Sequence, residues 1–342
     1  MSLKHFCLSI ALILAVTGCD YLPKTAQLAL NDEQKSQLAT QLQPSIQVVN
    51  KAFKTKQFVA LGDAHYYPGY MSEITKIVTS NKITPHVNKI VVEFGNQKSQ
   101  VWIDDYIAGK DVDETHLKHV LRETIYFTAW LNDDYLNFFK AIRTENQSRA
   151  KDNKINVILA ESHFDWNKNV TSQQWESAAQ NKVEGFYQQI EPLINSNEKA
   201  FLIFGGFHLL SSESQQHSLV DRINKAKPNA TFTVWPMIQK VLQHPFEQQE
   251  NGIISTSETT LAPIHFQDIM PKARFTLSKM DMSDANLQDL VDGFLYVGSN
   301  ERSLKLPESI SKDKLWKDEM QRRVKIIGGK LEDRFNQILN QQ

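Results

Sequence analysis

Six short apolar runs, separated by stretches of helical character, place the strongest constraint on the fold of this chain. They cover Phe58–Leu61, Ile90–Val92, Asn156–Leu159, Phe201–Phe204, Thr231–Trp235 and Gly293–Val297. Each run is continuously apolar rather than alternating, as expected of central strands that are covered on both faces. Their alternation with helical stretches predicts an α/β fold with a mostly parallel central sheet and helices on both faces.

The stretches between these runs indicate the helices and the domain organisation. Helical patterns cover residues 31–53, 70–81, 97–108, 133–148, 172–195, 211–225 and 312–339. Residues 97–153 separate two strands and predict a helical insertion. Residues 240–290 contain three prolines and a serine-threonine cluster, which predict a loop-rich excursion. We therefore expect residues 32–342 to form a single α/β domain.

The composition limits the classes of partner. The chain has 342 residues, with 38 Lys and Arg against 39 Asp and Glu, so its formal net charge is −1. This balance excludes a protein that binds nucleic acid through its overall charge, although it leaves room for a local basic patch. Hydrophobic residues make up 41% and aromatic residues 10%, which is the composition of a folded domain. No nucleic acid is expected as a partner.

The N-terminus has the pattern of a secretion signal over residues 1–18. Lys4 precedes an apolar run over residues 6–16, which is too short to span a bilayer comfortably. The sequence Val16-Thr17-Gly18-Cys19 resembles the lipobox of bacterial lipoproteins. The alternative is a short N-terminal anchor in which Cys19 has no role.

The lipobox resemblance implies a location for the protein. The signal would be cut before Cys19, which would then carry acyl chains, and residues 19–31 would form a tether. The partner would be a membrane of the bacterial cell envelope, with the domain facing the periplasm. Asp20 resembles the residue that retains lipoproteins in the inner membrane of enteric-type bacteria, so the inner membrane is favoured. Cys7 would leave with the signal, so a cysteine nucleophile or a thiolate metal site is excluded.

Ionisable residues follow four of the predicted strands. They occur in the sequences Gly62-Asp63-Ala64-His65, Glu93, Glu161-Ser162-His163 and Gly205-Gly206-Phe207-His208. Ligands bind at the carboxyl ends of strands in an open parallel sheet, so we expect these residues to share one pocket. The arrangement Gly-x-x-His occurs twice. Each glycine would allow a sharp turn with unusual backbone angles, which leaves the histidine free to point over the sheet.

These residue types suit two kinds of chemistry. His65 could act as a general base or a metal ligand, Glu93 could orient it or hold a metal-bound water, and His208 would complete the site. Together the three side chains could also ligate a divalent metal. Asp63, Glu161 and His163 would support them. The structural alternative is that each histidine is an ordinary surface residue and that Glu93 caps a helix.

Other candidates are weaker. Tyr66 and Tyr67 could bind a ligand by stacking or ligate haem iron through a phenolate, or they could line a lid. His116 and His119 fit a solvated helix better than a metal site, and Arg143 and Asn146 fit a helix surface. The chain has no Gly-x-Ser-x-Gly elbow, P-loop or dinucleotide fingerprint.

A family resemblance rests on three of these segments. Val59-Ala-Leu-Gly-Asp-Ala-His65, Val91-Val-Glu93 and Phe201-Leu-Ile-Phe-Gly-Gly-Phe-His208 together resemble the superfamily of erythromycin esterases, ChaN-type haem-binding lipoproteins and Tiki/TraB-type proteins. The resemblance spans roughly residues 57–300. Asp63 and Tyr66 depart from the esterase pattern, which has Glu and Gly at the corresponding positions.

The resemblance and the residues lead to three hypotheses. The first is a membrane-tethered periplasmic hydrolase that acts on an ester or amide of a small molecule or peptide, with a metal as a further component. The second is a ChaN-like lipoprotein that binds haem or another small ligand without catalysis. The third is a scaffold that keeps the fold without activity.

Overall fold

The computed structural model describes residues 30–83, 87–167, 169–211, 218–270 and 285–340. The predicted signal peptide, the predicted lipidation site at Cys19 and the tether before residue 30 lie outside the described residues. Within the part that is described, no helix is long and apolar enough to cross a membrane.

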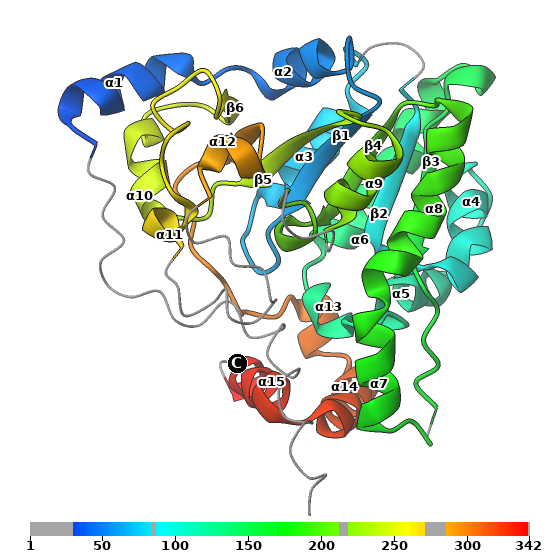
Figure 1. Cartoon of the computed structure of the whole chain (residues 1–342). Helices are drawn as coiled ribbons and strands as arrows, with labels where there is room; N and C mark the ends of the chain where they lie inside the picture. Colours follow the sequence, from blue (N-terminus) through cyan, green and yellow to red (C-terminus); the bar gives the residue numbers. More distant parts are fainter. Residues whose placement is uncertain (1–29, 84–86, 168, 212–217, 271–284, 341–342) are drawn as a thin grey trace, which may run out of the picture.

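The core of the protein is a seven-stranded sheet (Figure 1). The strands are β1 (Phe58–Asp63), β2 (Lys89–Asn96), β3 (Asn156–Glu161), β4 (Ala200–Gly205), β5 (Thr231–Pro236), β6 (Gly252–Ser255) and β7 (Gly293–Tyr296). Their order is β3-β2-β4-β1-β5-β7-β6, and all neighbouring pairs are parallel except β6 with β7. The prediction of a mostly parallel α/β sheet is confirmed.

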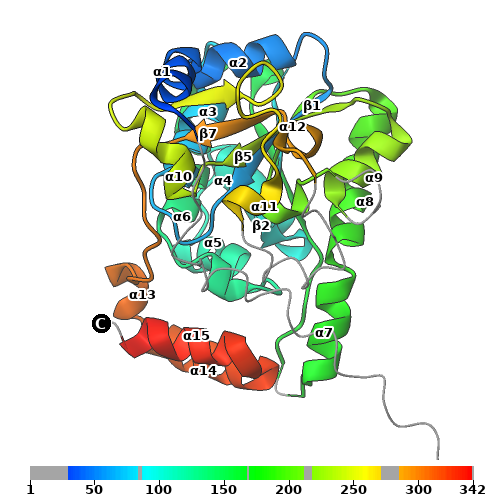
Figure 2. The same ribbon diagram turned by 60° about the vertical axis from the view of Figure 1, so that its left-hand side comes forward.

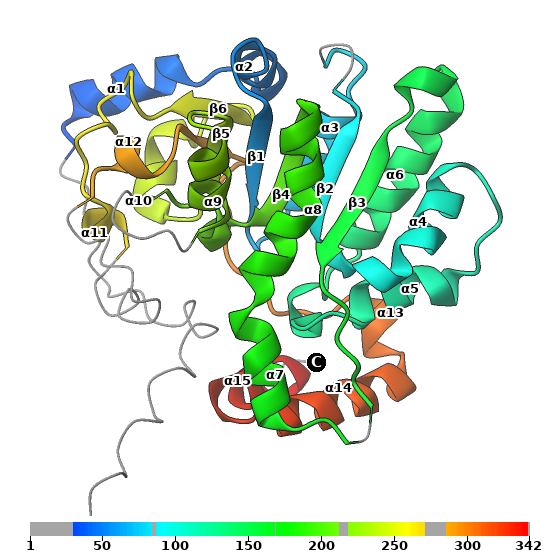
Figure 3. The same cartoon turned by 45° about the vertical axis from the view of Figure 1, so that its right-hand side comes forward.

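Helices cover both faces of the sheet (Figures 2 and 3). They are α1 (Asp32–Gln41), α2 (Ser45–Ala52), α3 (Tyr70–Thr79), α4 (Gln100–Ile107), α5 (Glu114–Arg122), α6 (Asp134–Ser148), α7 (Ser172–Gln180), α8 (Lys182–Ser196), α9 (Leu219–Ala226), α10 (Lys240–Gln243), α11 (Phe266–Ile269), α12 (Leu287–Leu290), α13 (Glu308–Ser311), α14 (Lys314–Ile327) and α15 (Gly329–Asn340). Single-turn 3-10 helices are η1 (Gln97–Ser99), η2 (Phe127–Ala129), η3 (Lys151–Asn153), η4 (Gly206–His208) and η5 (His244–Phe246).

The alternation of side chains along the central strands explains this two-sided packing. Val59 and Leu61 of β1 pack in the cluster that contains α3, α4 and α6. Phe58 and Ala60 of the same strand pack on the opposite face, against α8 and α9. Both sets are fully buried, which accounts for the continuously apolar sequence of the strand.

Several predicted elements differ in detail. The helix predicted over residues 31–53 is two helices, because Pro44 starts α2 and Gln43 pairs with Ile253 of β6. Residues 172–195 form α7 and α8, which meet at Asn181. The strand β6 lies inside the predicted loop-rich excursion and was not predicted, since its four residues are too short to show a periodic pattern.

The C-terminal helices lie beyond the carboxyl edge of the sheet, where α13, α14 and α15 pack with α7 (Figure 2). Arg323 of α14 is buried there and forms an ion pair with Glu123 at 2.7 Å. Its Nη1 donates to the carbonyl oxygen of Arg122 at 2.6 Å. These contacts tie the C-terminal helices to the loop that follows α5, and that loop reaches the candidate site.

Asn146 is buried in α6, so its predicted place on a helix surface is wrong. Its amide donates to the carbonyl oxygens of Ile107 and Ile155 and accepts from the Ile155 amide at 2.7 Å. Arg143 binds the backbone at the end of α4, through the carbonyl oxygen of Tyr106 at 2.6 Å. Both residues therefore fasten α6 to its neighbours.

We expect Asn146→Ala to lower the free energy of unfolding by about 2–4 kcal/mol, because it leaves buried backbone groups without partners. Urea denaturation followed by circular dichroism measures the change. Asn137→Ala, at an exposed position of the same helix, is the control and should change stability by less than about 0.5 kcal/mol. Equal effects of the two substitutions would contradict the role assigned to Asn146.

Candidate functional site

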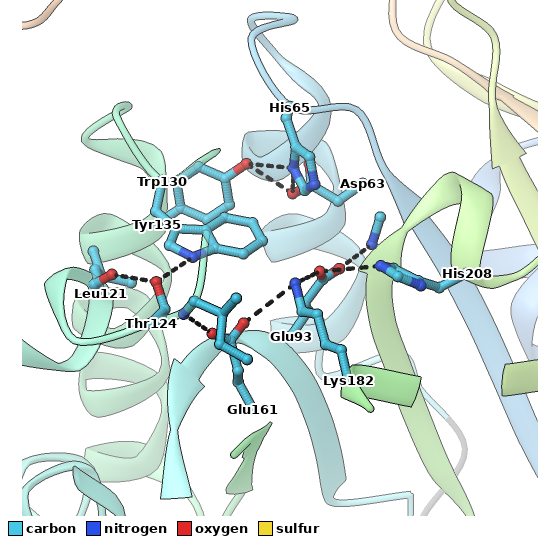
Figure 4. Close-up of polar contacts among 12 residues, drawn as sticks. Asp63, His65, Glu93, Leu121, Thr124, Trp130, Tyr135, Glu161, Lys182 and His208 are labelled. Atoms are coloured by element: carbon cyan, nitrogen blue, oxygen red, sulfur yellow. Dashed lines mark hydrogen bonds and ion pairs between the residues drawn. The ribbon is translucent and has the colours of Figure 1, made fainter. Parts of the chain in front are cut away.

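The parallel sheet brings four strand ends together at its carboxyl edge (Figure 4). Asp63 ends β1, Glu93 lies in β2, Glu161 ends β3 and Gly205 ends β4. These four strands are consecutive in the sheet. Asp63, Glu93 and Glu161 are all buried. The parallel pairing of these neighbouring strands brings their carboxyl ends, and the ionisable residues on them, to one edge of the sheet.

The first histidine of the site is held by a carboxylate. His65 Nδ1 lies 3.0 Å from Asp63 Oδ2, and the Tyr135 hydroxyl donates to the same oxygen at 2.7 Å. A carboxylate only accepts, so Nδ1 carries the proton of the neutral imidazole and Nε2 is left as an acceptor. The Trp130 ring packs edge-on against the imidazole at 4.7 Å and fixes its plane. The His65 side chain keeps 27% of its surface exposed.

The charge of Asp63 controls the titration of His65. Burial alone would lower the pKa of the imidazole, but the Asp63 carboxylate and its hydrogen bond outweigh burial and raise the pKa above its ordinary value of 6.5. Tyr135 keeps its proton, because burial, and then the Asp63 charge, raise the pKa of the phenol well above its usual range. Tyr135 is therefore a permanent donor to Asp63.

The second histidine is paired with Glu93. His208 Nε2 lies 3.3 Å from Glu93 Oε1, and the His208 side chain is 28% exposed. Lys182 Nζ donates to the same oxygen at 2.6 Å, and the Gly205 amide donates to Oε2 at 2.6 Å. Burial opposes ionisation of Glu93, but Lys182 and His208 hold the pKa of this carboxyl well below its usual range. Glu93 is therefore a buried anion.

Lys182 also contacts the third carboxylate. Its Nζ lies 3.3 Å from Glu161 Oε2, and the other oxygen of Glu161 accepts from the Ile125 amide. The Tyr126 ring covers the ammonium at 4.4 Å. Burial raises the pKa of Glu161, although Lys182 opposes this shift. Burial would lower the pKa of Lys182, but Glu161 and then Glu93 raise it, so Lys182 is a permanent cation.

Gly205 lets the two histidine pairs approach each other. A Cβ atom at this position would lie 2.9 Å from His65 Nε2 and 3.2 Å from Glu93 Oε2. The free nitrogen of His65 and the Glu93 carboxylate therefore face the same small space above Gly205. The backbone of Gly205 is extended, with φ −52° and ψ 133°, so the predicted unusual backbone angles are wrong there. Glycine is required at position 205 because a side chain would collide with His65 and Glu93, and not because of its backbone angles.

The remaining predicted residues lie around the site or away from it. His163 is exposed on the loop after β3. The Tyr66 hydroxyl donates to the carbonyl oxygen of Thr128 at 2.7 Å, so this phenol is directed at the backbone rather than at an iron ligand position. Tyr67 packs at the edge of the core. His116 stacks on Trp102 at 4.5 Å, on a surface helix as expected.

Three side chains of the candidate site were not predicted from the sequence, namely Lys182, Tyr135 and Trp130. Lys182 is the first residue of α8 and Tyr135 the second residue of α6, and each has the pattern of an ordinary helix residue. A possible signal was the burial of Glu93 and Glu161 in apolar strands, since buried carboxylates require a partner. Trp130 also borders a cavity of about 220 Å³, lined in part by Phe127, Leu131 and Trp316.

The side chains of the candidate site do not offer a place for the predicted divalent metal. Across the described residues, no group of three or more His, Cys, Asp or Glu side chains is placed to hold a metal ion. Both oxygens of Glu93 already accept hydrogen bonds, and the Lys182 ammonium occupies the place a cation would take. The donors present do not fit a metal held by His65, Glu93 and His208.

Comparisons with known proteins support the fold. No family model and no curated protein matches the chain. It is similar in structure to a Bacillus cereus protein, with a TM-score of 0.52 at 9% identity over 80% of this chain and 99% of that one. It is also similar to a protein described as a succinoglycan biosynthesis protein, with a TM-score of 0.50 at 8% identity over 80% and 98% of the two chains. At these identities the likeness concerns the fold alone.

We expect Lys182→Met to lower the free energy of unfolding by about 3–5 kcal/mol at pH 7, because it leaves Glu93 and Glu161 buried without their cation. Without Lys182 the pKa of Glu161, which burial already raises, rises further, and the pKa of Glu93 loses the largest influence that lowers it. The variant therefore recovers part of the loss as the pH falls toward 5 and the carboxyls take up protons. Urea denaturation at the two pH values measures both effects.

The control is Lys118→Met, which removes a partly exposed ion pair with Glu114. It should cost less than about 1 kcal/mol at either pH. A Lys182→Met variant as stable as the wild type would show that Lys182 does not balance the buried carboxylates.

Proposed function

We propose that this protein is a hydrolase in which His65 is the general base that activates water for attack on an ester or amide. The observation that carries the proposal is the Asp63–His65 pair, which holds Nδ1 protonated and leaves Nε2 facing the space above Gly205. A histidine with one nitrogen bound to a carboxylate and the other free is the arrangement that general-base catalysis needs.

The residues divide the reaction between them. His65 Nε2 takes a proton from water while the water oxygen bonds to the acyl carbon. The bond from that carbon to the leaving oxygen or nitrogen breaks, and the leaving group receives a proton from His208. Asp63 stabilises the positive charge that develops on His65 during this step. Glu93, which Lys182 and the Gly205 amide keep ionised and fixed, holds His208 in place as the proton donor.

Two further observations support this reading. The segments that end in His65, Glu93 and His208 resemble the erythromycin esterase, ChaN and Tiki/TraB superfamily, and all three residues meet at one edge of the sheet. The lipobox-like sequence around Cys19 supports a location in the bacterial cell envelope, tethered to a membrane and facing the periplasm. The direction of Tyr66 toward Thr128 favours the hydrolase over the haem carrier.

We expect His65→Ala and His208→Ala each to reduce kcat at least a hundredfold, because each removes one proton-transfer group. The assay follows release of nitrophenol and nitroaniline from a panel of aryl esters and anilides. His119→Ala, at an exposed histidine of α5, is the matched control and should keep the wild-type rate. Circular dichroism checks that the variants are folded. A His65→Ala enzyme with the wild-type rate would refute the proposal.

The pH dependence provides a second test. His65 must be neutral to accept a proton, and Asp63 raises its pKa, so the rising limb of the pH profile should have its midpoint above 6.5. In Asp63→Asn the carboxylate is gone and burial lowers the pKa, so the midpoint should move to lower pH. A profile of kcat/KM from pH 5 to 9 measures both midpoints. An unchanged midpoint in Asp63→Asn would show that another group titrates.

A further inference from the structure

The amino-terminal edge of the sheet, opposite the candidate site, concentrates positive charge. The segments that lead into the strands β3, β2, β4, β1 and β5 are residues 149–156, 80–83 with 87–89, 196–200, 51–57 and 225–231. They contain eleven Lys and Arg against two acidic residues, a net charge of +9. The chain as a whole has a net charge of −1, so the remainder carries −10. We call this surface the basic edge.

The cations of the basic edge are at the surface. Five are exposed and six are partly exposed: Lys51, Lys54, Lys82, Lys151 and Lys225, and then Lys56, Lys89, Arg149, Lys154, Lys199 and Lys227. Ion pairs join Lys89 to Glu198 and Arg149 to Glu145. Hydrogen bonds join neighbouring segments, for example Lys199 to the Phe53 carbonyl oxygen and Lys227 to Asn197. The basic edge is therefore one continuous surface.

Helix dipoles explain only part of this charge. The helices α2, α3, α6, α8 and α9 end at the basic edge, and cations are favoured near the C-terminus of a helix. Each helix end corresponds to about half a negative charge, so five ends offset about two to three of the nine net positive charges. Most of the positive charge is left to face solvent or a partner.

We propose that the basic edge binds the anionic surface of a phospholipid bilayer. Clustered lysines and arginines within a Debye length of anionic headgroups are attracted to them. The described chain starts at residue 30, and α1 and α2 run along the end of the molecule that carries the basic edge (Figure 1). The eleven residues from Cys19 to that point reach at most about 40 Å. A tether of this length keeps the domain beside the membrane to which Cys19 would be attached.

This assignment gives the protein a defined orientation. The candidate site lies at the carboxyl edge of the sheet, so a bilayer on the basic edge leaves the site facing away from the membrane (Figure 3). The proposal goes beyond the proposed hydrolase function and does not depend on the reaction at His65. In this proposal the folded domain itself contacts the membrane, in addition to the acyl chains that Cys19 would carry.

The test is sedimentation of the full chain with vesicles of neutral phosphatidylcholine, or of phosphatidylcholine with 30% phosphatidylglycerol, a composition chosen as roughly that of an anionic membrane. The N-terminal segment is the same in the wild type and in the variants, so the difference between them reports the charge of the basic edge. The variant Lys54→Glu/Lys82→Glu/Lys151→Glu should reduce the affinity for anionic vesicles at least tenfold and leave neutral vesicles unaffected. Raising the salt should weaken wild-type binding to anionic vesicles.

The matched control is Lys314→Glu/Lys325→Glu/Lys330→Glu, which makes the same change of net charge at exposed positions of α14 and α15. It should keep the wild-type affinity. Equal binding of the wild type to both kinds of vesicle, or equal losses in the two variants, would overturn the proposal. Tighter binding to a short DNA or RNA duplex than to anionic vesicles would assign the basic edge to nucleic acid instead and would also overturn it.

Discussion

The buried ion pair between Lys182 and Glu93 is the interaction on which the site depends. Glu93 comes from β2 and Lys182 from α8, so the pair fixes the start of a helix to the second strand from one edge of the sheet. Removing these two charges from water costs several kcal/mol for each ion. We therefore assign the pair to the positioning of Glu93 and α8 rather than to a gain in the free energy of unfolding. Lys182 and the Gly205 amide each donate to an oxygen of Glu93, so this carboxylate stays ionised and has a fixed orientation. In that orientation Glu93 Oε1 contacts His208.

The segment over residues 124–130 connects the candidate site to the rest of the molecule. Ile125 donates to Glu161, Tyr126 covers Lys182 and Trp130 packs on His65, so three residues of one loop contact three ionisable side chains. The loop is held in turn by tryptophans from beyond the sheet, because Trp166 donates to the Thr124 carbonyl oxygen and Trp175 to that of Ile125. Arg323 of α14 fixes the residues just before the loop. The C-terminal helices thus support the site without contributing a group to it.

The sequence was sufficient for six of the seven strands and for the ionisable residues at their ends, and the reason is periodicity. A strand buried on both faces is continuously apolar, so β1 to β5 and β7 were visible, and the parallel topology then brought Asp63, Glu93 and Glu161 to one edge. The partners of these residues come from helices and loops, where local sequence carries no mark of what the side chain meets. Lys182 illustrates this limit, because a lysine at the start of an amphipathic helix has the same pattern whether it faces water or two carboxylates.

The two Gly-x-x-His turns show how one sequence pattern can have two physical causes. At Gly62, inside β1, a Cβ atom would lie 2.6 Å from Pro236 Cδ and 3.1 Å from the Val234 carbonyl oxygen, so this glycine permits close packing of β1 on β5. At Gly205 the same atom would meet His65 Nε2 and Glu93 Oε2, so that glycine permits the approach of the two histidine pairs. The Gly205 amide also binds Glu93. Gly205 therefore has two roles: its missing side chain leaves space above the strand, and its amide binds the Glu93 carboxylate beside that space. The two turns have the same sequence pattern, but only the second glycine belongs to the candidate site.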